Sequence, residues 1–420
     1  MKRLGALTRI AVTLMAVLVL TVPLAAQESQ PQASTTQQYT VQDLGTLGGT
    51  FSFAYGITNN GSVAGFSYMP GDMTWHAFLW RKGLMTDLGT LGGANSIPWG
   101  SRPLNEKNEV VGSAETSTPD PFGEDFCRFG TFLTCASFLW RDGVMSALPT
   151  LGGNNGNAVS INNRGQAAGG AENLTLDDCG LRLFQRKPVI WTKGQIEELP
   201  TLSGDTVGFV NGINDPGQAV GLSTSCTASH AVLWERGTVT YLGSLGGNDS
   251  GSMGINNRGQ VFGFSYLADN MTYHGFRWQK GIGMQDLETL PGDTYSDAWG
   301  IDNKGRVVAS SCDASFNCRA VLWQGGMMTD LNTLIPADSG WFLVEADGIN
   351  ARGEIVGLGC TDVECHAFLA TPKASGAASD SLTAPSNNRA RPTVVLPENV
   401  RKLLQQRQGD RFGVGLVRPQ

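Results

Sequence analysis

The sequence predicts an all-β protein, a seven-bladed β-propeller, and three observations support this prediction. One unit recurs seven times along the chain, each copy contains the signals of four short strands, and the two end copies are complementary fragments. A unit of about 44 residues holds four strands and their turns, but it is too short for an independent sandwich domain of about 100 residues. Four-stranded units repeated around an axis form a β-propeller, and seven blades lie within the usual range.

Three short sequence motifs, here called words, recur in each unit and are numbered by their order along the chain. The second word is GINNRGQVFGFS at 254–265, with a weaker variant in unit 2, RPLNEKNEVVGS at 102–113. The third is HAFLW, complete at 76–80. Such self-similarity indicates one supersecondary unit that stacks on copies of itself. The first word, DLGTLGG or a degraded form, starts at Asp43, Asp87, Ala147, Glu198, Tyr241, Asp286 and Asp330, which we take as the starts of the blade repeats.

Strand and turn signals alternate within these words. In GINNRGQVFGFS, an Asn-rich turn that ends in Gly joins two apolar runs, as a β-hairpin requires. HAFLWRKGLMTDL is a second hairpin, with Lys82 and Gly83 in its turn. Its first strand is apolar on both faces, so both faces must be covered by neighbouring sheets.

The two chain ends complete each other. The repeats begin at YTVQDLG, the last strand of a unit, and unit 7 stops at HAFLATP (366–372) without that strand. Together with six complete units, the two fragments give seven sets of four strands. We therefore predict that residues 39–44 pair with residues 366–371 and close the ring, which removes two exposed sheet edges.

The repeated words resemble a bacterial family described as probable extracellular repeats, HAF family, named after the His-Ala-Phe triplet. The triplet is complete at 76–78 and 366–368 and partial at 230–232 and 274–276, whereas units 2, 3 and 6 lack the His. The resemblance spans residues 39–372. It implies an exported bacterial repeat protein, and it implies no activity and no catalytic residues.

The segments outside the repeats differ in composition. Residues 1–26 have a basic start, a short apolar run and small residues, which is typical of a secretory signal peptide. We expect cleavage near Ala26 and export to the periplasm or the extracellular space, with an uncleaved N-terminal anchor as the alternative. Residues 27–38 form a linker, residues 39–372 the propeller and residues 373–420 a basic tail. Within the tail we predict a short helix at 397–407, which either docks on the acidic body, touches an anionic surface or frays.

Charge is unevenly distributed along the chain. The tail from Lys373 holds eight Lys and Arg against three carboxylates, a net charge of +5, and without the signal peptide the remaining body is near −15. A body this acidic argues against nucleic acid as a partner, because phosphate binding needs a basic face. No segment of the mature chain is apolar over a membrane-spanning length. We expect a monomer.

All eight cysteines lie between the second and third strands of their units, which favours disulfides over metal ligation in an exported protein. The expected pairs are Cys127 with Cys135, Cys312 with Cys318 and Cys360 with Cys365, which leaves Cys179 and Cys226 in neighbouring units. These loops share one face of the propeller, the loop face, with the TLGG connections. The opposite face, the turn face, carries the NNRG and RKG turns. Long, braced, unequal loops are typical of a recognition surface, whereas short uniform turns are typical of scaffold.

Two insertions on the loop face, 115–135 and 172–187, bring carboxylates close to aromatic residues. We interpret the carboxylates as a solvated rim, with a Ca²⁺ site or an acid/base pair as alternatives. No other cofactor and no catalytic or metal-ligating residue is predicted, and the four histidines, which share one repeat position, are expected to be structural. The candidate binding residues are Trp75, Trp99, Glu115, Asp120, Phe122, Glu124, Asp125, Phe126, Asp177, Asp178, Trp299 and Trp341.

These observations predict an exported, non-catalytic binding module that recognises a glycan, an envelope component or a protein through its loop face. One alternative is a hydrolase or lyase that acts on extracellular glycan, and another is an architectural cell-surface protein. An enzyme should carry unrepeated polar residues that converge on the axis, whereas the unrepeated residues of this sequence gather mainly in the two outer loops.

Overall fold

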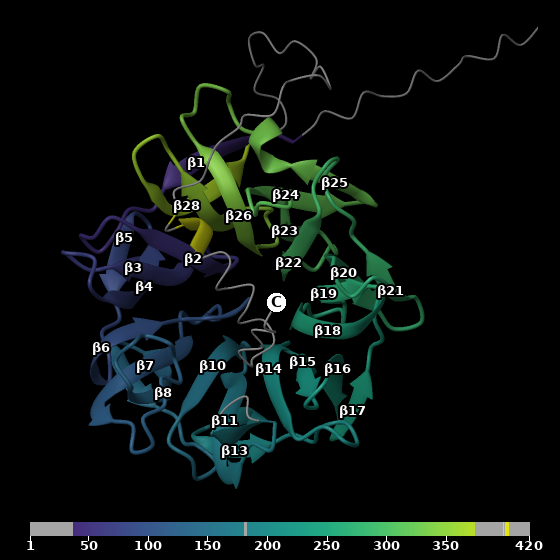
Figure 1. Cartoon of the computed structure of the whole chain (residues 1–420). Helices are drawn as coiled ribbons and strands as arrows, with labels where there is room; N and C mark the ends of the chain where they lie inside the picture. The colour runs from purple at the N-terminus through teal and green to yellow at the C-terminus, as the bar shows by residue number, and fades with distance from the viewer. Residues whose placement is uncertain (1–36, 180–182, 374–397, 399, 403–420) are drawn as a thin grey trace, which may run out of the picture. The chain divides into compact units, whose positions relative to one another are not determined.

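The structure is a computed structural model that describes residues 37–179, 183–373, 398 and 400–402. The described strands form seven four-stranded antiparallel sheets around a common axis (Figure 1). The seven-bladed β-propeller predicted from the sequence is therefore confirmed. The predicted signal peptide, most of the linker and most of the basic tail lie outside the described residues. Among the described residues, no helix is long and apolar enough to cross a membrane.

Each blade runs from an inner strand near the axis to a short outer strand. Blades 1 and 2 contain β2 (Ser52–Ile57), β3 (Val63–Tyr68), β4 (Trp75–Arg81), β5 (Leu84–Asp87), β6 (Gly92–Ile97), β7 (Val110–Pro119), β8 (Leu133–Arg141) and β9 (Val144–Ala147). Blades 3 and 4 contain β10 (Gly156–Ile161), β11 (Gln166–Leu176), β12 (Phe184–Thr192), β13 (Gln195–Glu198), β14 (Val207–Ile213), β15 (Ala219–Thr224), β16 (Ser229–Glu235) and β17 (Thr238–Tyr241). Blades 5 and 6 contain β18 (Gly246–Ile255), β19 (Val261–Leu267), β20 (Tyr273–Gln279), β21 (Gly283–Asp286), β22 (Tyr295–Ile301), β23 (Val307–Cys312), β24 (Cys318–Gln324) and β25 (Met327–Asp330). Blade 7 contains β26 (Phe342–Ile349), β27 (Ile355–Cys360), β28 (Cys365–Pro372) and β1 (Tyr39–Asp43), and the 3-10 helix η1 (Leu331–Thr333) precedes it.

The seventh blade joins the two ends of the repeat region. β1 pairs antiparallel with β28, from Tyr39 opposite Pro372 to Asp43 opposite Phe368. The predicted closure is confirmed, with the partner segment one residue further along than expected. Tyr39 is 1% exposed and its backbone N–H donates to the carbonyl of Leu334 at 2.8 Å. The first strand therefore belongs to the core and leaves no free edge on β28.

Apolar side chains from adjacent blades interleave to form the core. Trp80 and Phe78 of blade 1, for example, lie in one buried cluster with Val356 and Leu369 of blade 7. The strand-three tryptophans pack in these layers. The indole N–H of Trp191 donates to the carbonyl of Pro149 at 2.8 Å, and that of Trp234 donates to the carbonyl of Pro200 at 2.6 Å. These contacts explain why the strands are apolar on both faces.

The first Asn of the GINN word ties neighbouring blades together on the turn face. Asn162 Oδ1 accepts hydrogen bonds from the backbone N–H groups of Arg164 and Gln166 and so closes its own turn. Asn162 Nδ2 donates to the carbonyl of Asn214 in the next blade at 3.0 Å. The same donation to the next blade is made by Asn105, Asn214, Asn256 and Asn350. One side chain thus stabilises both a turn and an interface.

The residue after this first Asn takes part in a second set of hydrogen bonds, which runs from blade to blade and is called the turn ring below. The backbone N–H of Asn163 donates to Asp215 Oδ1 at 2.9 Å, and that of Asp215 donates to Asn257 Oδ1 at 2.9 Å. Equivalent bonds run from residue 351 to 59, 59 to 106, 106 to 163 and 257 to 303. At the seventh step the acceptor position is Ala351, whose side chain has no acceptor. The turn ring is therefore closed at six of seven positions.

The repeated histidines connect the HAF word to a carboxylate. His76 Nδ1 lies 2.9 Å from Asp87 of the DLG word, and His274 makes the equivalent contact with Asp286. In blade 4, where the DLG word begins with Tyr241, His230 instead contacts Asp205 at 3.0 Å. The pairing explains why the His and the Asp recur together in the sequence.

Candidate binding surfaces on the two faces

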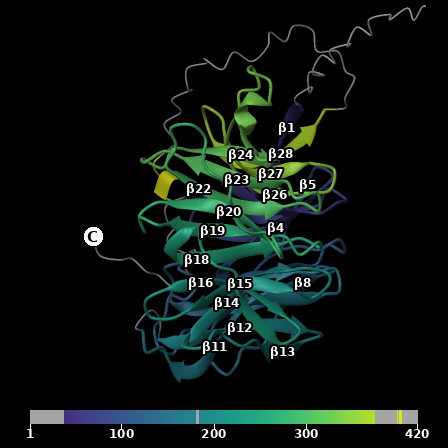
Figure 2. The same cartoon turned by 90° about the vertical axis from the view of Figure 1, so that its right-hand side faces the viewer.

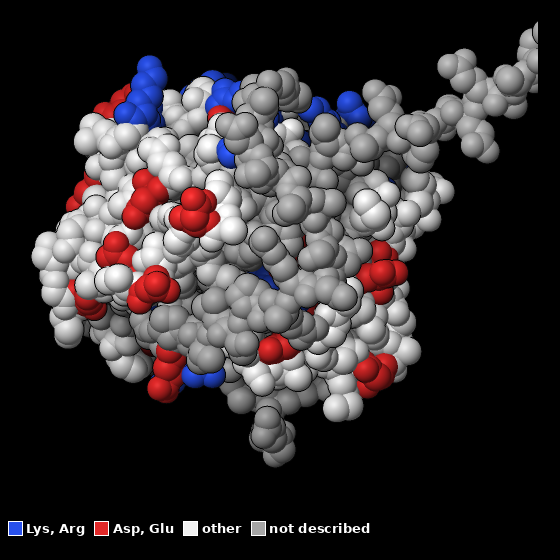
Figure 3. Space-filling view, turned by 90° about the horizontal axis from the view of Figure 1, so that it is seen from above, with Lys and Arg blue, Asp and Glu red and all other residues white. Residues whose placement is uncertain are grey.

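The two faces of the propeller carry opposite charge. Among the described residues of the connections between strands, the loop face holds 14 carboxylates and one cation, whereas the turn face holds 11 cations and six carboxylates. Seen from above, the basic side chains gather mostly along one edge and the acidic ones lie over the rest of the visible side (Figure 3). The loop-face carboxylates are Asp72, Asp120, Glu124, Asp125, Asp177, Asp178, Asp205, Asp269, Glu288, Asp293, Asp313, Asp338, Asp362 and Glu364. The turn-face cations are Lys82, Arg102, Lys107, Arg164, Lys193, Arg236, Arg258, Lys280, Lys304, Arg306 and Arg352. Each face therefore favours partners of a different charge.

Four disulfides brace the loop face, and no cysteine is free. They join Cys127 to Cys135, Cys179 to Cys226, Cys312 to Cys318 and Cys360 to Cys365, which are the pairs expected from the sequence. The pair Cys179–Cys226 connects the loops of blades 3 and 4. Four disulfides in one domain indicate an oxidising environment.

An aromatic cluster is formed by side chains of blades 1, 2, 6 and 7. Trp75 packs edge-on against Phe129 with ring centroids 5.4 Å apart, and Tyr68 lies 5.7 Å from Trp75. Trp99 stacks on Tyr55 at 6.4 Å. The aromatic cluster comprises Phe51, Phe53, Tyr55, Phe66, Tyr68, Trp75, Trp99, Phe129, Tyr295 and Phe342, together with the disulfides of blades 6 and 7. Trp75 and Trp99, two predicted contact residues, thus share one apolar surface.

A part of the C-terminal segment packs into the aromatic cluster. Val400 is 2% exposed and belongs to the same apolar cluster as Phe51 and Val344. Residues 398 and 400–402 are helical, inside the helix predicted at 397–407. Glu398 and Lys402 form an exposed ion pair of 2.8 Å on this helix. Figure 2 shows the short helix at one face of the propeller.

Two predicted carboxylates of the blade-2 insertion are buried and hold the loop in place. Glu115 is 1% exposed, and its Oε2 accepts from the backbone N–H groups of Ala94 and Asn95 at 3.1 and 3.0 Å. Asp120 accepts from the backbone N–H of Phe122 at 2.9 Å and from Asn155 Nδ2 at 3.0 Å. These contacts use the carboxylates to shape the loop face.

The outer parts of the insertions remain more accessible. Phe122 is 56% exposed and meets Phe184 edge-on at 4.9 Å, while Phe126 is buried. Glu124 Oε1 accepts from the backbone N–H of Leu183 at 3.0 Å, so the two insertions touch. Three more carboxylates lie along this rim: Asp125 accepts from the N–H of Gly130, Asp177 accepts from the N–H of Cys179, and Asp178 is exposed.

The last two predicted tryptophans lie within blades 6 and 7. Trp299 is 7% exposed and its indole N–H donates to Ser310 Oγ at 3.2 Å. Trp341 is half-buried against Gly359, where an added Cβ would approach the indole to 2.8 Å. The structure therefore does not bring these two residues to the blade-2 and blade-3 insertions.

One group of side chains has the composition of a metal site. Asp43, Glu364 and His366 place ligand-type atoms within 4.8 Å of one another at the seam between β1 and β28. His366 Nδ1 already contacts the Asp43 carboxylate, and its Nε2 lies 3.5 Å from Glu364. The arrangement repeats the His–Asp contact of the other blades, with one further carboxylate.

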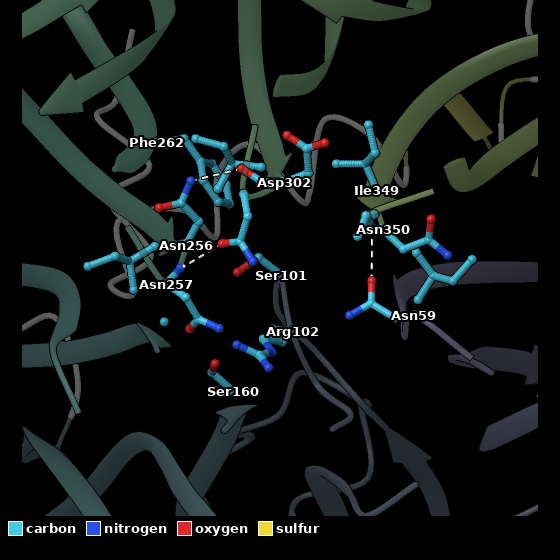
Figure 4. A pocket seen from close by; sticks show the side chains of 18 of the residues that line it. Asn59, Ser101, Arg102, Ser160, Asn256, Asn257, Phe262, Asp302, Ile349 and Asn350 are labelled. Carbon is cyan, nitrogen blue, oxygen red and sulfur yellow. Dashed lines mark hydrogen bonds between the residues drawn. The ribbon is translucent and has the colours of Figure 1, made fainter. Parts of the chain in front are cut away.

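A polar cavity opens at the turn-face end of the axis. It has a volume of about 120 Å³ and is bounded by the inner-strand ends of several blades. Isoleucines such as Ile57 and Ile349 form its walls, and residues of the turn ring form its rim. Figure 4 shows Arg102 pointing into this space between Asn59 and Asn257. None of these residues was predicted as a site residue.

Arg102 reaches the axis because blade 2 has a longer connection between its first two strands. Residues 98–109 separate β6 from β7, and they cross toward the opposite blades. The hydroxyl of Ser101 donates to the carbonyl of Met253 in blade 5 at 2.9 Å, and the carbonyl of Arg102 accepts from the N–H of Ile161 at 3.0 Å. In the sequence, only the weak match of RPLNEKNEVVGS to the second word of the other units marks this connection as different. None of the four histidines lines the cavity, so Ser101 has no histidine base beside it.

Comparisons with known proteins concern the fold alone. No family model and no curated protein matches the sequence. Among solved structures, the β-propeller domain of the Trilobed protease from Pyrococcus furiosus is 10% identical, with a TM-score of 0.44 over 66% of this chain and 83% of that chain. A puromycin-hydrolyzing peptidase from Mycobacterium tuberculosis is 12% identical, with a TM-score of 0.45 over 73% and 48%. Aleuria aurantia lectin is 10% identical, with a TM-score of 0.34 over 80% and 95%. The propeller assignment itself rests on the strand pairings described above.

Proposed function

We propose that this chain is an exported binding protein whose loop face holds a basic polypeptide segment with an apolar side. Three properties of that face support the proposal. The described residues of its connections include 14 carboxylates against one cation, the aromatic cluster supplies apolar surface, and four disulfides hold the loops in one shape. Such a combination attracts a cationic partner and lowers the entropic cost of binding it.

The single observation that carries the proposal is the position of Val400. It is buried in the aromatic cluster, and it is followed directly by Arg401 and Lys402. The tail to which it belongs carries eight cations in the sequence. An apolar side chain followed by two cations is therefore what the loop face accepts from its own chain, and a partner of the same chemistry would compete for the same place.

The fluorescently labelled peptide VLPENVRKLLQQR (395–407) tests this function against the protein ending at residue 393. We expect saturable binding that weakens as ionic strength rises, because charge attraction contributes to it. A peptide with Val400→Asp should bind at least tenfold more weakly, and the intact chain should bind the unchanged peptide more weakly than the shortened one. Equal binding of both peptides, or no binding to the shortened protein, would overturn the proposal.

A matched pair of protein variants locates the contact. Trp75→Ala removes an aromatic side chain of the cluster, whereas Trp341→Ala removes one that packs in a different apolar cluster of blades 6 and 7. The first substitution should weaken the peptide at least fivefold and the second should leave its affinity unchanged. The reverse order would place the contact outside the aromatic cluster.

A further inference from the structure

Arg102 has unused hydrogen-bonding capacity inside the axial cavity. Its guanidinium carries five N–H donors, and its one contact among the described residues is a long one, 3.5 Å from Nη2 to Asp215 Oδ1. The side chain is 28% exposed and projects into the cavity, as Figure 4 shows. A fork of donors facing an open polar space is the arrangement that binds an oxygen anion.

Asp215 is already satisfied by other donors. Its Oδ1 accepts from the N–H of Asn163 at 2.9 Å, and its Oδ2 accepts from Asn163 Nδ2 at 2.9 Å and Asn257 Nδ2 at 2.7 Å. Burial by itself raises the pKa of Asp215, but these hydrogen bonds and the Arg102 charge outweigh it and hold the pKa below its usual range. Because Asp215 is anchored in the turn ring, it orients Arg102 without consuming its donors.

The surroundings of Arg102 select the kind of anion. Carboxamides of the turn ring, such as Asn257 and Asn303, stand at the rim and offer both donors and acceptors, which suits hydroxyl groups. Glu106 and Asp302 line the cavity, and Asp215 borders it beside Arg102. Asp302 is paired with Arg306 at 2.7 Å. Carboxylates around the site repel a dianion more strongly than a monoanion. The mouth is encircled by exposed cations of the turns, namely Lys107, Arg164, Arg258, Lys304 and Arg352. These charges draw a single negative charge toward the axis.

We propose that the axial cavity binds a hydroxylated carboxylate, with the Arg102 fork on the carboxylate and the turn-ring carboxamides on the neighbouring hydroxyls. The source is either a free sugar acid or the acidic end of an oligosaccharide, since both present the same group. About 120 Å³ accommodates one such unit and not several. No residue that lines the cavity belongs to the aromatic cluster, so the site is independent of the function proposed above.

Calorimetric titration of the intact mature protein tests the site with galacturonate, trigalacturonate, galactose and inorganic phosphate as probes. Galacturonate should bind at least tenfold more tightly than galactose or phosphate. Tighter binding of trigalacturonate would assign the source to an oligosaccharide end, and equal binding would assign it to the free acid. Equal or tighter binding of galactose or phosphate would overturn the proposal.

Two variants assign the binding to the axis. Arg102→Gln keeps a polar side chain but removes the cation, and we expect at least a tenfold loss of galacturonate affinity. Asn303→Asp keeps an oxygen that accepts the hydrogen bond from the backbone N–H of Asn257, and it puts a negative charge at the rim. We expect about a fivefold loss of galacturonate affinity. This variant tests the site even if Arg102→Gln fails to fold. Asn248→Asp adds the same charge on the loop face and should have no effect. Unchanged affinity in either axial variant would remove the site.

Discussion

His366 Nδ1 lies 3.0 Å from the carboxylate of Asp43, although 323 residues separate them in the chain. This contact at the seam is equivalent to the contact between His76 and Asp87 within blade 1. The ring therefore closes with the same side-chain pair that blades 1 and 5 use locally. The seam differs from blade 1 in that its two partners come from opposite ends of the repeat region and that Glu364 lies 3.5 Å from His366.

The seam depends on the burial of Tyr39. Tyr39→Ala removes a side chain that is 1% exposed and should lower the free energy of unfolding by about 3 kcal/mol, as for other buried aromatic residues. Denaturant unfolding followed by tryptophan fluorescence measures the loss. Thr40→Ala, on the exposed side of the same strand, should cost under about 0.5 kcal/mol. Similar losses for both variants would mean that β1 is not part of the core.

Asp87 should make stability depend on acid pH. Burial raises the pKa of this carboxyl, but the hydrogen bonds from His76 and from the N–H of Gly89, with the His76 charge, lower the pKa below its ordinary value. Its contribution is thus fully present above the ordinary pKa, near 4, and is lost as the pH falls through the lowered native value. Because the side chain is 37% exposed, the effect should stay below about 1 kcal/mol.

The measurement compares the unfolding free energies of the unchanged protein and of Asp87→Asn between pH 6 and pH 2. The difference between them should shrink as the pH drops below about 4. In a His76→Ala background the same difference should be smaller at every pH. A difference that grows toward low pH would contradict the assigned direction.

Ala351→Asn should close the turn ring. The new Oδ1 would occupy the acceptor position that Asn59 and Asn163 fill for their preceding blades, and would accept from the backbone N–H of Asn303. One added hydrogen bond contributes about 1 kcal/mol, so the thermal midpoint should rise by about 1–3 °C. Scanning calorimetry of Ala351→Asn beside Ala351→Ser, whose shorter side chain does not reach the same position, would show whether the ring position causes the gain.

The disulfide Cys179–Cys226 should matter more for stability than the others. It spans 47 residues, against 5 for Cys360–Cys365. In the chain-entropy description, a loop of that length contributes about 4 kcal/mol and the short one about 2 kcal/mol. Paired Cys→Ser variants compared by chemical denaturation give both values. An equal or smaller loss for Cys179→Ser with Cys226→Ser would show that blades 3 and 4 are held together by other contacts.

Several features of the fold were predictable because they are local or periodic. The count of seven blades followed from the spacing of DLGTLGG, and ring closure followed from the truncated units at Tyr39 and Pro372. Three disulfide pairs followed from cysteines at the two ends of single loops, and Cys179 and Cys226 were the two that remained. In each case a repeated unit has one way to bury its apolar faces, so the pattern determines the arrangement.

The site was less predictable. Glu115 and Asp120 looked like surface carboxylates because their acidic insertion resembles a solvated loop, yet they are buried by hydrogen bonds to neighbouring segments. The role of Arg102 is not visible in the sequence, because a weak repeat word gives no indication that its longer connection crosses the axis. Contacts of this kind depend on which blades face each other, and the sequence of one blade does not contain that information.

The sequence by itself determined the all-β architecture, the number of blades and the pairing of the chain ends, because hydrophobic periodicity and turn residues act over a few positions. Only the tertiary structure separated the charges into an acidic loop face and a basic turn face, since successive connections of a blade emerge at opposite ends of the sheet. It also placed Arg102 beside Asp215 and Val400 among the aromatic residues of blades 1, 2, 6 and 7. Those neighbours are distant in the chain and meet because the ring closes.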